Sequence, residues 1–289
     1  MASRVHSPGY MFTSTNLFET SDSDLDSVPA SLQLRKNRPF ADLATISVGG
    51  VSELVRAWPG TLESGHACED CDEHVREAKL IQDSLLPKAG LCHKSVELEY
   101  RFMPFRDVGG DFVDFFQLPD GLICIYLGDV VGKGLTAAMF AALVMGTLRG
   151  VHKSGTDTAA VLSRLNERLL QRPIRGRFCS TFYGVYNPAT RELTFSNAGM
   201  PLPLLVSGNK CRPLGQGGLP SGLFQGATYE QHVVQLKAGD CVLFATDGLH
   251  ELTNKAGVEF CDAEMKKVWA QCKNRTASES ADFLFERQV

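Results

Sequence analysis

The stretch Val108-Gly-Gly-Asp-Phe-Val-Asp-Phe-Phe-Gln-Leu-Pro-Asp-Gly-Leu-Ile-Cys-Ile-Tyr-Leu-Gly-Asp-Val-Val-Gly-Lys-Gly134 decides the fold. Two apolar runs, 112–118 and 122–127, flank Pro119-Asp120-Gly121, whose residue types are those of a tight turn. The pattern therefore predicts a β-hairpin.

The ends of this hairpin carry acidic residues. Asp111 precedes the first strand and Asp129 follows the second, so pairing around the turn brings the two carboxylates side by side. Like charges repel and are costly to desolvate unless a cation lies between them, and hard oxygen ligands select Mg²⁺ or Mn²⁺. Asp247 follows the apolar run 241–245 in the same way. We therefore predict that three aspartates converge on one pole of a sandwich and hold metal.

Other interpretations of the stretch are weaker. Gly109-Gly-Asp-Phe112 resembles the diguanylate cyclase signature, but that signature lies on the turn of its own hairpin and carries a second acidic residue. Gly128 to Gly134 is one residue short of a phosphate-binding P-loop and lacks its Ser or Thr. For Asp111 or Asp129 taken alone, a role as a turn residue or helix cap stays open.

Composition and charge exclude several classes. The chain has 289 residues, 44% of them hydrophobic and 21% charged, with a formal net charge of −4, which leaves no basic footprint for nucleic acid. The start lacks the apolar core of a signal peptide, and the longest apolar run, 135–148, is too short to span a bilayer. We expect a cytoplasmic protein with neither nucleic acid nor membrane as partner.

The cysteines support the same compartment. Nine cysteines is an odd number, and Cys124 and Cys241 lie inside apolar strand patterns, where a free thiol behaves as a small hydrophobe. His66, Cys68, Cys71 and His74 are four soft ligands within nine positions and form a candidate zinc site. Structural zinc sites usually draw ligand pairs from separated segments, so incidental spacing is the favoured interpretation.

The chain divides into three parts. Residues 1–66, rich in Ser, Thr and Asp, are predicted to form a disordered or weakly ordered leader. Residues 67–88 form a linker helix whose apolar stripe docks or dimerises; Pro87 ends it. In the rest we predict helices at 134–150 and 158–171, the second capped by Asp157, and strands at 96–102, 180–186, 192–197 and 202–206. Two more strands, 229–236 and 241–245, are predicted to pair with each other through residues 237–240.

Several motifs together resemble the bacterial PPM-type serine phosphatases, in the branch that regulates sigma factors in sporulation and stress responses. The resemblance runs from about residue 80 to the end of the chain. It implies an α+β fold, an α-β-β-α sandwich of two antiparallel sheets flanked by helices, with 89–289 as the phosphatase domain. The motifs are Leu85-Leu-Pro87, Pro104-Phe-Arg-Asp-Val-Gly-Gly-Asp-Phe-Val-Asp114, Gly128-Asp-Val-Val-Gly-Lys-Gly134, Asn197-Ala-Gly-Met-Pro201 and Gly239-Asp-Cys-Val-Leu-Phe-Ala-Thr-Asp-Gly-Leu-His-Glu251.

The resemblance also implies a phosphoserine/phosphothreonine protein phosphatase that uses two Mn²⁺ or Mg²⁺ ions to activate water. By this resemblance Asp129 bridges the two ions, the Val130 carbonyl completes one shell, and Asp247 binds the second ion. Asp111 holds a metal or its waters, and Arg106 grips the substrate phosphate. The implied substrate is a phosphorylated anti-anti-sigma (STAS-type) protein, with an upstream regulator or a homodimer partner at the 67–88 helix.

Two departures qualify this resemblance. Met200 stands where the branch commonly has His, and the chain stops at residues 285–289, before the final strand whose Asp-Asp-x-Thr motif supplies another metal ligand. We therefore expect the final strand to be lacking and the second metal site to be weakened. The alternative function is a catalytically inactive phosphatase-like scaffold that binds signalling partners.

Overall fold

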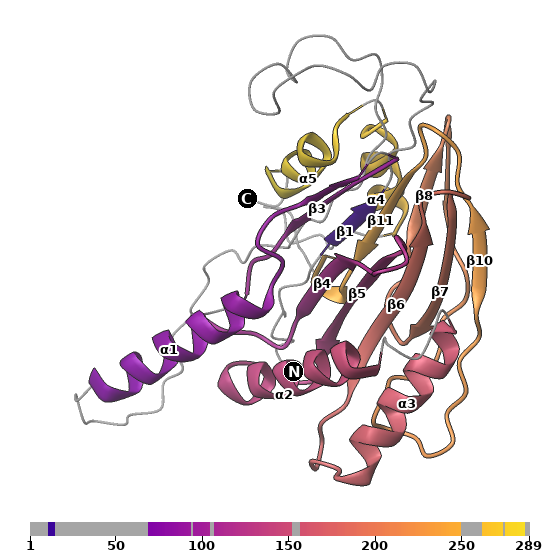
Figure 1. Cartoon of the computed structure of the whole chain (residues 1–289). Coiled ribbons are helices and arrows are strands. Elements are labelled where there is room, and N and C mark those ends of the chain that lie inside the picture. The colour runs from indigo at the N-terminus through magenta and orange to yellow at the C-terminus, as the bar shows by residue number, and fades with distance from the viewer. Residues whose placement is uncertain are drawn as a thin grey trace.

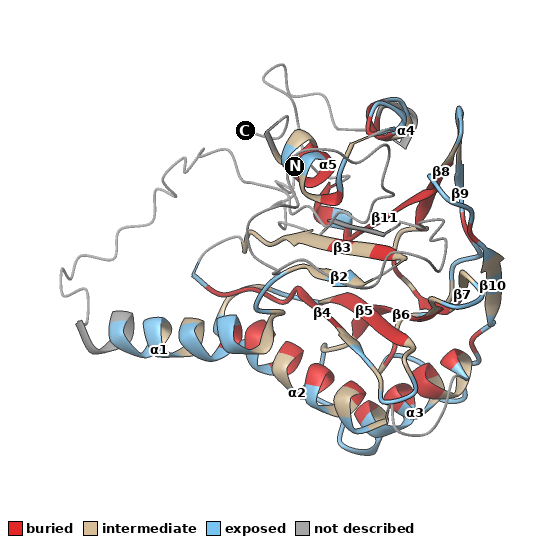
Figure 2. Ribbon diagram, turned by 45° about the horizontal axis from the view of Figure 1, so that its top comes forward, coloured by how far each residue is buried: buried red, intermediate tan, exposed pale blue. Residues whose placement is uncertain are grey.

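The computed structural model describes residues 11–14, 69–93, 95–104, 107–151, 157–249, 262–273 and 275–286. Two antiparallel β-sheets stack face to face, and helices cover the outer face of each sheet (Figure 1). Figure 2 shows the four layers in turn, from α4 and α5 through the two sheets to α2 and α3. The predicted α-β-β-α sandwich is confirmed.

The five-stranded sheet has the order β10-β7-β6-β5-β4 and contains the central hairpin. At the turn, Leu118 N donates to Leu122 O over 2.7 Å and Gly121 N donates to Leu118 O over 2.9 Å. The Asp120 carboxylate accepts from Leu122 N over 3.2 Å, so the turn chemistry produces the predicted hairpin. The strands are β4 (Phe112–Gln117), β5 (Ile123–Val130), β6 (Cys179–Asn187), β7 (Glu192–Ala198) and β10 (His232–Gln235).

The six-stranded sheet has the order β2-β3-β1-β11-β8-β9. Its third strand, β1, comes from the far N-terminal segment and pairs antiparallel with both β3 and β11. This strand lies within the predicted leader; the remainder of that segment lies outside the described residues, so the leader stays a prediction. The strands are β1 (Met11–Ser14), β2 (Leu91–His93), β3 (Val96–Arg101), β8 (Leu204–Ser207), β9 (Lys210–Pro213) and β11 (Cys241–Ala245).

The predicted pairing of the last two strands is wrong. β10 pairs with β7 in one sheet, while β11 pairs with β1 and β8 in the other. The turn between them is closed by Asp240, whose backbone N donates to Lys237 O and whose carboxylate accepts from Lys237 N over 2.9 Å. Leu236 is buried and its N donates to Arg191 O, so the chain crosses from one sheet to the other at this point.

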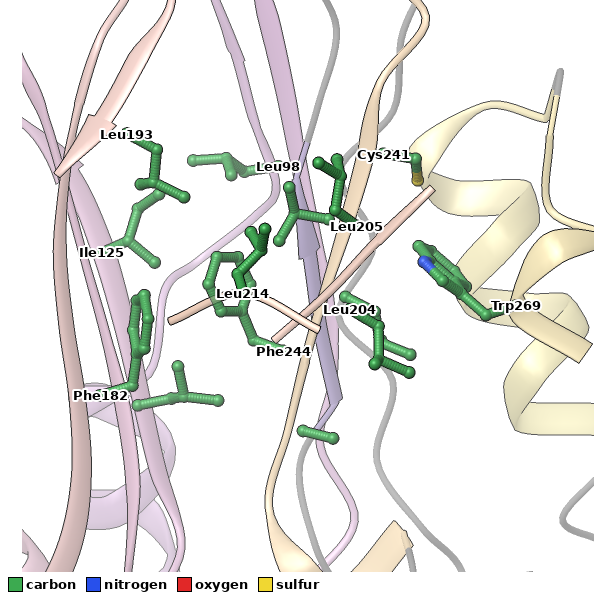
Figure 3. Close-up of a cluster of buried hydrophobic side chains, with 14 of the residues drawn as sticks. Leu98, Ile125, Phe182, Leu193, Leu204, Leu205, Leu214, Cys241, Phe244 and Trp269 are labelled. Atoms are coloured by element: carbon green, nitrogen blue, oxygen red, sulfur yellow. The ribbon is translucent and has the colours of Figure 1, made fainter. Parts of the chain in front are cut away.

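Apolar side chains of both sheets fill the space between them (Figure 3). Phe182 of β6 meets Phe244 of β11 with ring centroids 4.6 Å apart, and both rings are almost completely buried. Ile125 and Leu98 extend this contact from opposite sheets. Burying a side chain of this size contributes about 1.5–3 kcal/mol, so the sandwich is stabilised chiefly by this layer.

The outer helices follow from local signals. α3 (Thr158–Gln171) begins at Asp157, whose carboxylate accepts from Ala160 N over 2.9 Å, which confirms the predicted cap. α2 (Leu135–Val151) buries Ala137, Ala138 and Ala141 against the five-stranded sheet. α4 (Asp262–Ala270) and α5 (Ala277–Glu286) cover the other sheet.

Helix α1 (Glu69–Leu85) contacts α2 and projects from the sandwich (Figure 1). Its docking face contains Ala78 and Leu85 of the predicted apolar stripe together with Gln82, which is buried at 8% exposure, whereas Ile81 is 62% exposed. Across the described part of the chain, no helix combines the length and the apolar character that a membrane crossing requires.

Candidate functional site

The open end of the central hairpin brings two aspartates together. Phe112 pairs with Gly128, and beyond this pair Val130 N donates to Gly110 O over 3.3 Å. Asp111 and Asp129 are therefore neighbours across the hairpin, as predicted. Asp129 lies inside β5 rather than after it, because β6 extends the ladder to the Asp129–Ser180 pair.

Gly110 lets the two strands approach closely at this point. A Cβ atom on Gly110 would lie 2.6 Å from the Val130 carbonyl oxygen and 3.2 Å from Asp129 Oδ1. Only glycine leaves room for these oxygens to lie against the backbone that leads into Asp111. Asp111 is buried at 3% exposure, and Asp129 is half-buried.

The donor atoms at the hairpin end are all oxygens. Two carboxylates and one backbone carbonyl are hard oxygen donors, the type that Mg²⁺ and Mn²⁺ prefer. The hairpin end therefore fits a divalent cation in its donor chemistry.

The third aspartate comes from the other sheet. Asp247 is exposed and begins the short helix η2 (Asp247–Leu249) at the end of β11, in the other sheet. Among the described residues, no group of three or more His, Cys, Asp or Glu side chains is arranged to hold a metal ion. The predicted convergence of all three aspartates stays a prediction.

Two other sets of predicted site residues lie wholly or partly outside the described residues. Arg106 lies outside the described residues, as do His66 and Cys68 of the zinc alternative. His74, the fourth zinc candidate, is exposed on α1. These predictions remain predictions.

Arg177 holds the loop that follows Asp129. One of its nitrogens donates to the Val131 carbonyl, and another donates to Thr136 Oγ1 over 2.8 Å. Gly132, at φ +110°, lies under the guanidinium group, where a Cβ atom would clash with it. Arg177 thus fixes the peptide next to the Val130 carbonyl and joins it to the first turn of α2.

Gln82 ties α1 to the residues that lead into Asp111. Its amide nitrogen donates to Gly109 O over 2.7 Å, and its amide oxygen accepts from Gly109 N over 3.1 Å. Both partners are buried, so the pair satisfies two backbone groups that water cannot reach. An apolar hollow of about 100 Å³ lies beside this contact, between α1 and α2, and Asp111 is part of its wall.

A second tie joins the end of α1 to the central hairpin. Arg149 of α2 donates to the Leu85 carbonyl over 2.7 Å and forms an ion pair of 2.8 Å with Asp114 of β4. Tyr126 of β5 donates to the same carboxylate over 2.8 Å. Burial raises the pKa of Tyr126, and the Asp114 charge raises it further, so the phenol stays protonated and remains a donor.

The Asn197-Ala-Gly-Met-Pro201 motif forms a turn. The Asn197 side chain accepts from Met200 N over 2.8 Å and donates to Met200 O over 2.9 Å. Met200 itself is buried at 5% exposure, so the residue that departs from the expected His is part of the core.

Sequence reasoning did not single out Gln82, Arg149 or Arg177. Their partners are mainly backbone carbonyls far away in the chain, which no local pattern identifies. One signal was available, because Gln82 is a polar residue within the apolar stripe of an amphipathic helix.

The four layers, with the hairpin that carries the paired carboxylates, have the fold of a solved PP2C domain. The family described as "Stage II sporulation protein E (SpoIIE)" matches residues 119–288, more than half of the chain, and the chain belongs to this family.

Individual relatives agree with this assignment. The phosphoserine phosphatase RsbU of Bacillus subtilis is 25% identical over 191 residues, which cover 65% of this chain and 57% of that protein. The chain thus matches little more than half of that relative's length.

Solved structures share the fold. The SiaA-PP2C domain of Pseudomonas aeruginosa superposes with a TM-score of 0.66 at 20% identity, covering 78% of this chain and 93% of that one. The RsbU and RsbW domains of Rv1364c from Mycobacterium tuberculosis match with a TM-score of 0.53 at 27% identity, covering 63% of this chain and 50% of that one.

Proposed function

We propose that this chain is a metal-dependent phosphoserine/phosphothreonine protein phosphatase. The observation that carries the proposal is the hairpin end, where Asp111, Asp129 and the Val130 carbonyl lie together within a phosphatase fold. Similarity to a protein named as a phosphoserine phosphatase supports it.

The proposed cofactors are two Mn²⁺ or Mg²⁺ ions. Asp111, Asp129 and the Val130 carbonyl would hold one ion, and Asp129 together with Asp247 would hold the second, weaker one. When bound, the ions supply an activated water and neutralise charge on the phosphate.

The chain's own cations would orient the reactants. Arg177 keeps the Val130 carbonyl directed toward the hairpin end by holding the adjacent peptide. Arg106, five residues before Asp111, would grip the phosphate, since a guanidinium group matches two phosphate oxygens at once.

The proposed substrate is a phosphorylated STAS-type anti-anti-sigma protein in partner switching. Support comes from the family and from the Mycobacterium tuberculosis protein, in which RsbU and RsbW domains occur in one chain.

The proposed division is a leader of residues 1–66, a regulatory segment of residues 67–88 that contains α1, and a phosphatase domain of residues 89–289. The Gln82–Gly109 contact supports a regulatory role for α1, because a shift of this helix would move the backbone two residues before Asp111. Leu80 and Ile81, 70% and 62% exposed, give α1 an apolar face for a regulator or a second copy.

The direct test is Mn²⁺-dependent hydrolysis of p-nitrophenyl phosphate. Asp129→Asn is expected to lower kcat/KM about 100-fold or more, since it removes a charged metal ligand. Asp120→Asn is the matched control, because it makes the same change at the hairpin turn and keeps the oxygen that accepts from Leu122 N. A wild-type chain without activity at any Mn²⁺ concentration would favour the scaffold alternative.

A further inference from the structure

A second hollow, of about 350 Å³, lies between α2 and α3. Its wall includes the buried side chains Phe140 and Leu169 and the half-exposed Leu143. Arg168 and Arg172, both exposed, also line the wall. These five residues define the α2–α3 hollow. It joins an apolar surface to two guanidinium groups.

The charge around this hollow is opposite in sign to that of the whole chain. The chain carries a net charge of −4, yet residues 168–178 contain four arginines and no acidic residue. The facing helix, α2, also contains no Asp or Glu. The surface near the α2–α3 hollow is therefore locally basic on an acidic protein, and it attracts acidic groups.

The hollow lies along α2, which begins beside the hairpin end. α2 begins directly after the loop that Arg177 holds, and Val131 N donates to Phe178 O over 3.1 Å. Leu143 lies eight residues beyond Leu135, which is about 12 Å along a helix axis. An extended peptide advances about 3.3 Å per residue, so about four residues cover this distance.

We infer that the α2–α3 hollow docks an acidic segment of the phosphoprotein substrate, about four residues from the phosphoserine. One bulky apolar side chain of that segment would enter between Phe140 and Leu169, and flanking carboxylates would pair with Arg168 and Arg172. Guanidinium groups match carboxylates in geometry as well as in charge, which selects acidic over basic segments. This inference rests on the proposed phosphatase function.

The test compares phosphoserine peptides that differ in one feature. Two pairs of peptides are used: the leucine lies four residues before the phosphoserine in one pair and four residues after it in the other. Within each pair, two glutamates flank the leucine of one peptide and two lysines flank the leucine of the other. For the wild-type protein with Mn²⁺, the better acidic peptide is expected to have a KM about five- to tenfold lower than its lysine counterpart. Equal KM values for the acidic and the basic peptides would overturn the inference.

Variants locate the effect. Arg168→Gln combined with Arg172→Gln is expected to abolish the preference for the acidic peptide. Lys210→Gln combined with Arg212→Gln, the same change on the exposed strand β9, is expected to keep it. Hydrolysis of p-nitrophenyl phosphate, which has no flanking chain to reach the hollow, reports whether either variant is still folded and active. A preference that survives in the Arg168/Arg172 variant overturns the inference.

Binding separates this inference from the proposed function. Fluorescence anisotropy of a labelled acidic peptide, measured without added metal, needs no hydrolysis. Binding that depends on Arg168 and Arg172 in a protein without phosphatase activity would retain the docking site and reject the proposed function. Hydrolysis by the wild-type protein, with equal binding of the acidic peptide to the wild type and to the Arg168/Arg172 variant, would retain the proposed function and reject the docking site.

Discussion

Arg177 shows how a single side chain outside the carboxylate pair can decide the geometry of the site. It donates to the Val131 carbonyl and to Thr136, so it joins the loop after β5 to the first turn of α2. The Val130 carbonyl is one peptide away. In the proposed metal site the carbonyl ligand must point at its ion, and holding the next peptide in place also holds this oxygen.

Replacing Arg177 should therefore weaken metal use. We expect Arg177→Ala to raise the Mn²⁺ concentration for half-maximal activity about tenfold, as loss of a group that orients a ligand commonly does. Thermal denaturation with and without Mn²⁺ should show a smaller metal-induced rise in Tm. Arg212→Ala, an exposed arginine on β9, is the control. Wild-type metal dependence in Arg177→Ala would contradict this role.

Buried thiols give a second prediction at this scale. Burial raises the pKa of both Cys124 and Cys179 to about 12, so very little reactive thiolate is present near pH 8. Cys92 is exposed. We expect iodoacetamide at pH 8 to label Cys92 in the folded protein and to label Cys124 and Cys179 only in urea, as peptide mass spectrometry would show. Equal labelling rates in the folded protein would contradict the burial.

At the scale of elements, helix α1 is attached to the domain at two points of different kind. Gln82 bonds both backbone groups of Gly109, beside the site, and Arg149 bonds the Leu85 carbonyl at the helix end. The first contact depends on hydrogen bonds alone. The second also contains the Arg149–Asp114 ion pair, so it connects the helix end to the middle of β4.

The Gln82 contact can be broken separately. Gln82→Ala leaves a buried N–H and a buried C=O of Gly109 without these partners, which is expected to cost about 1–3 kcal/mol of unfolding free energy. Hydrogen–deuterium exchange should be faster in the peptide that covers residues 107–112. Glu77→Ala changes an exposed residue on the same helix and should leave that exchange unchanged. Unaltered exchange in Gln82→Ala would mean that α1 does not restrain the site.

At the scale of the whole molecule, the two sheets are built differently. Most of the five-stranded sheet forms from strands that are neighbours in the chain, through the β4–β5 and β6–β7 hairpins. The six-stranded sheet depends on β1, which is the strand that joins β3 to β11. Without it, this sheet would consist of two separate pieces.

A proline in β1 should test this dependence. Thr13→Pro removes a backbone donor from a strand paired on both sides, and we expect a loss of at least about 2 kcal/mol in unfolding free energy. Thr13→Val keeps a β-branched side chain and the backbone donor, so its urea midpoint should stay close to that of the wild type. Equal midpoints for all three proteins would show that β1 adds no stability.

Local chemistry made the hairpin turn at Asp120, the helix cap at Asp157 and the adjacency of Asp111 and Asp129 predictable. Each of these depends on residues that are close in the chain or paired through one turn. The sheet that receives β10 and the role of β1 were not predictable in this way. They depend on pairing between distant segments, for which a single sequence carries no local signal.

The position of β1 also has a consequence for biosynthesis. Among the described strands, β1 leaves the ribosome first and its partner β11 leaves it last. Closing so long a loop is slow, whereas the hairpins of the five-stranded sheet can form as they emerge. Until β11 arrives, β1 presents an open edge to other nascent chains, so the order of synthesis exposes this protein to aggregation during translation.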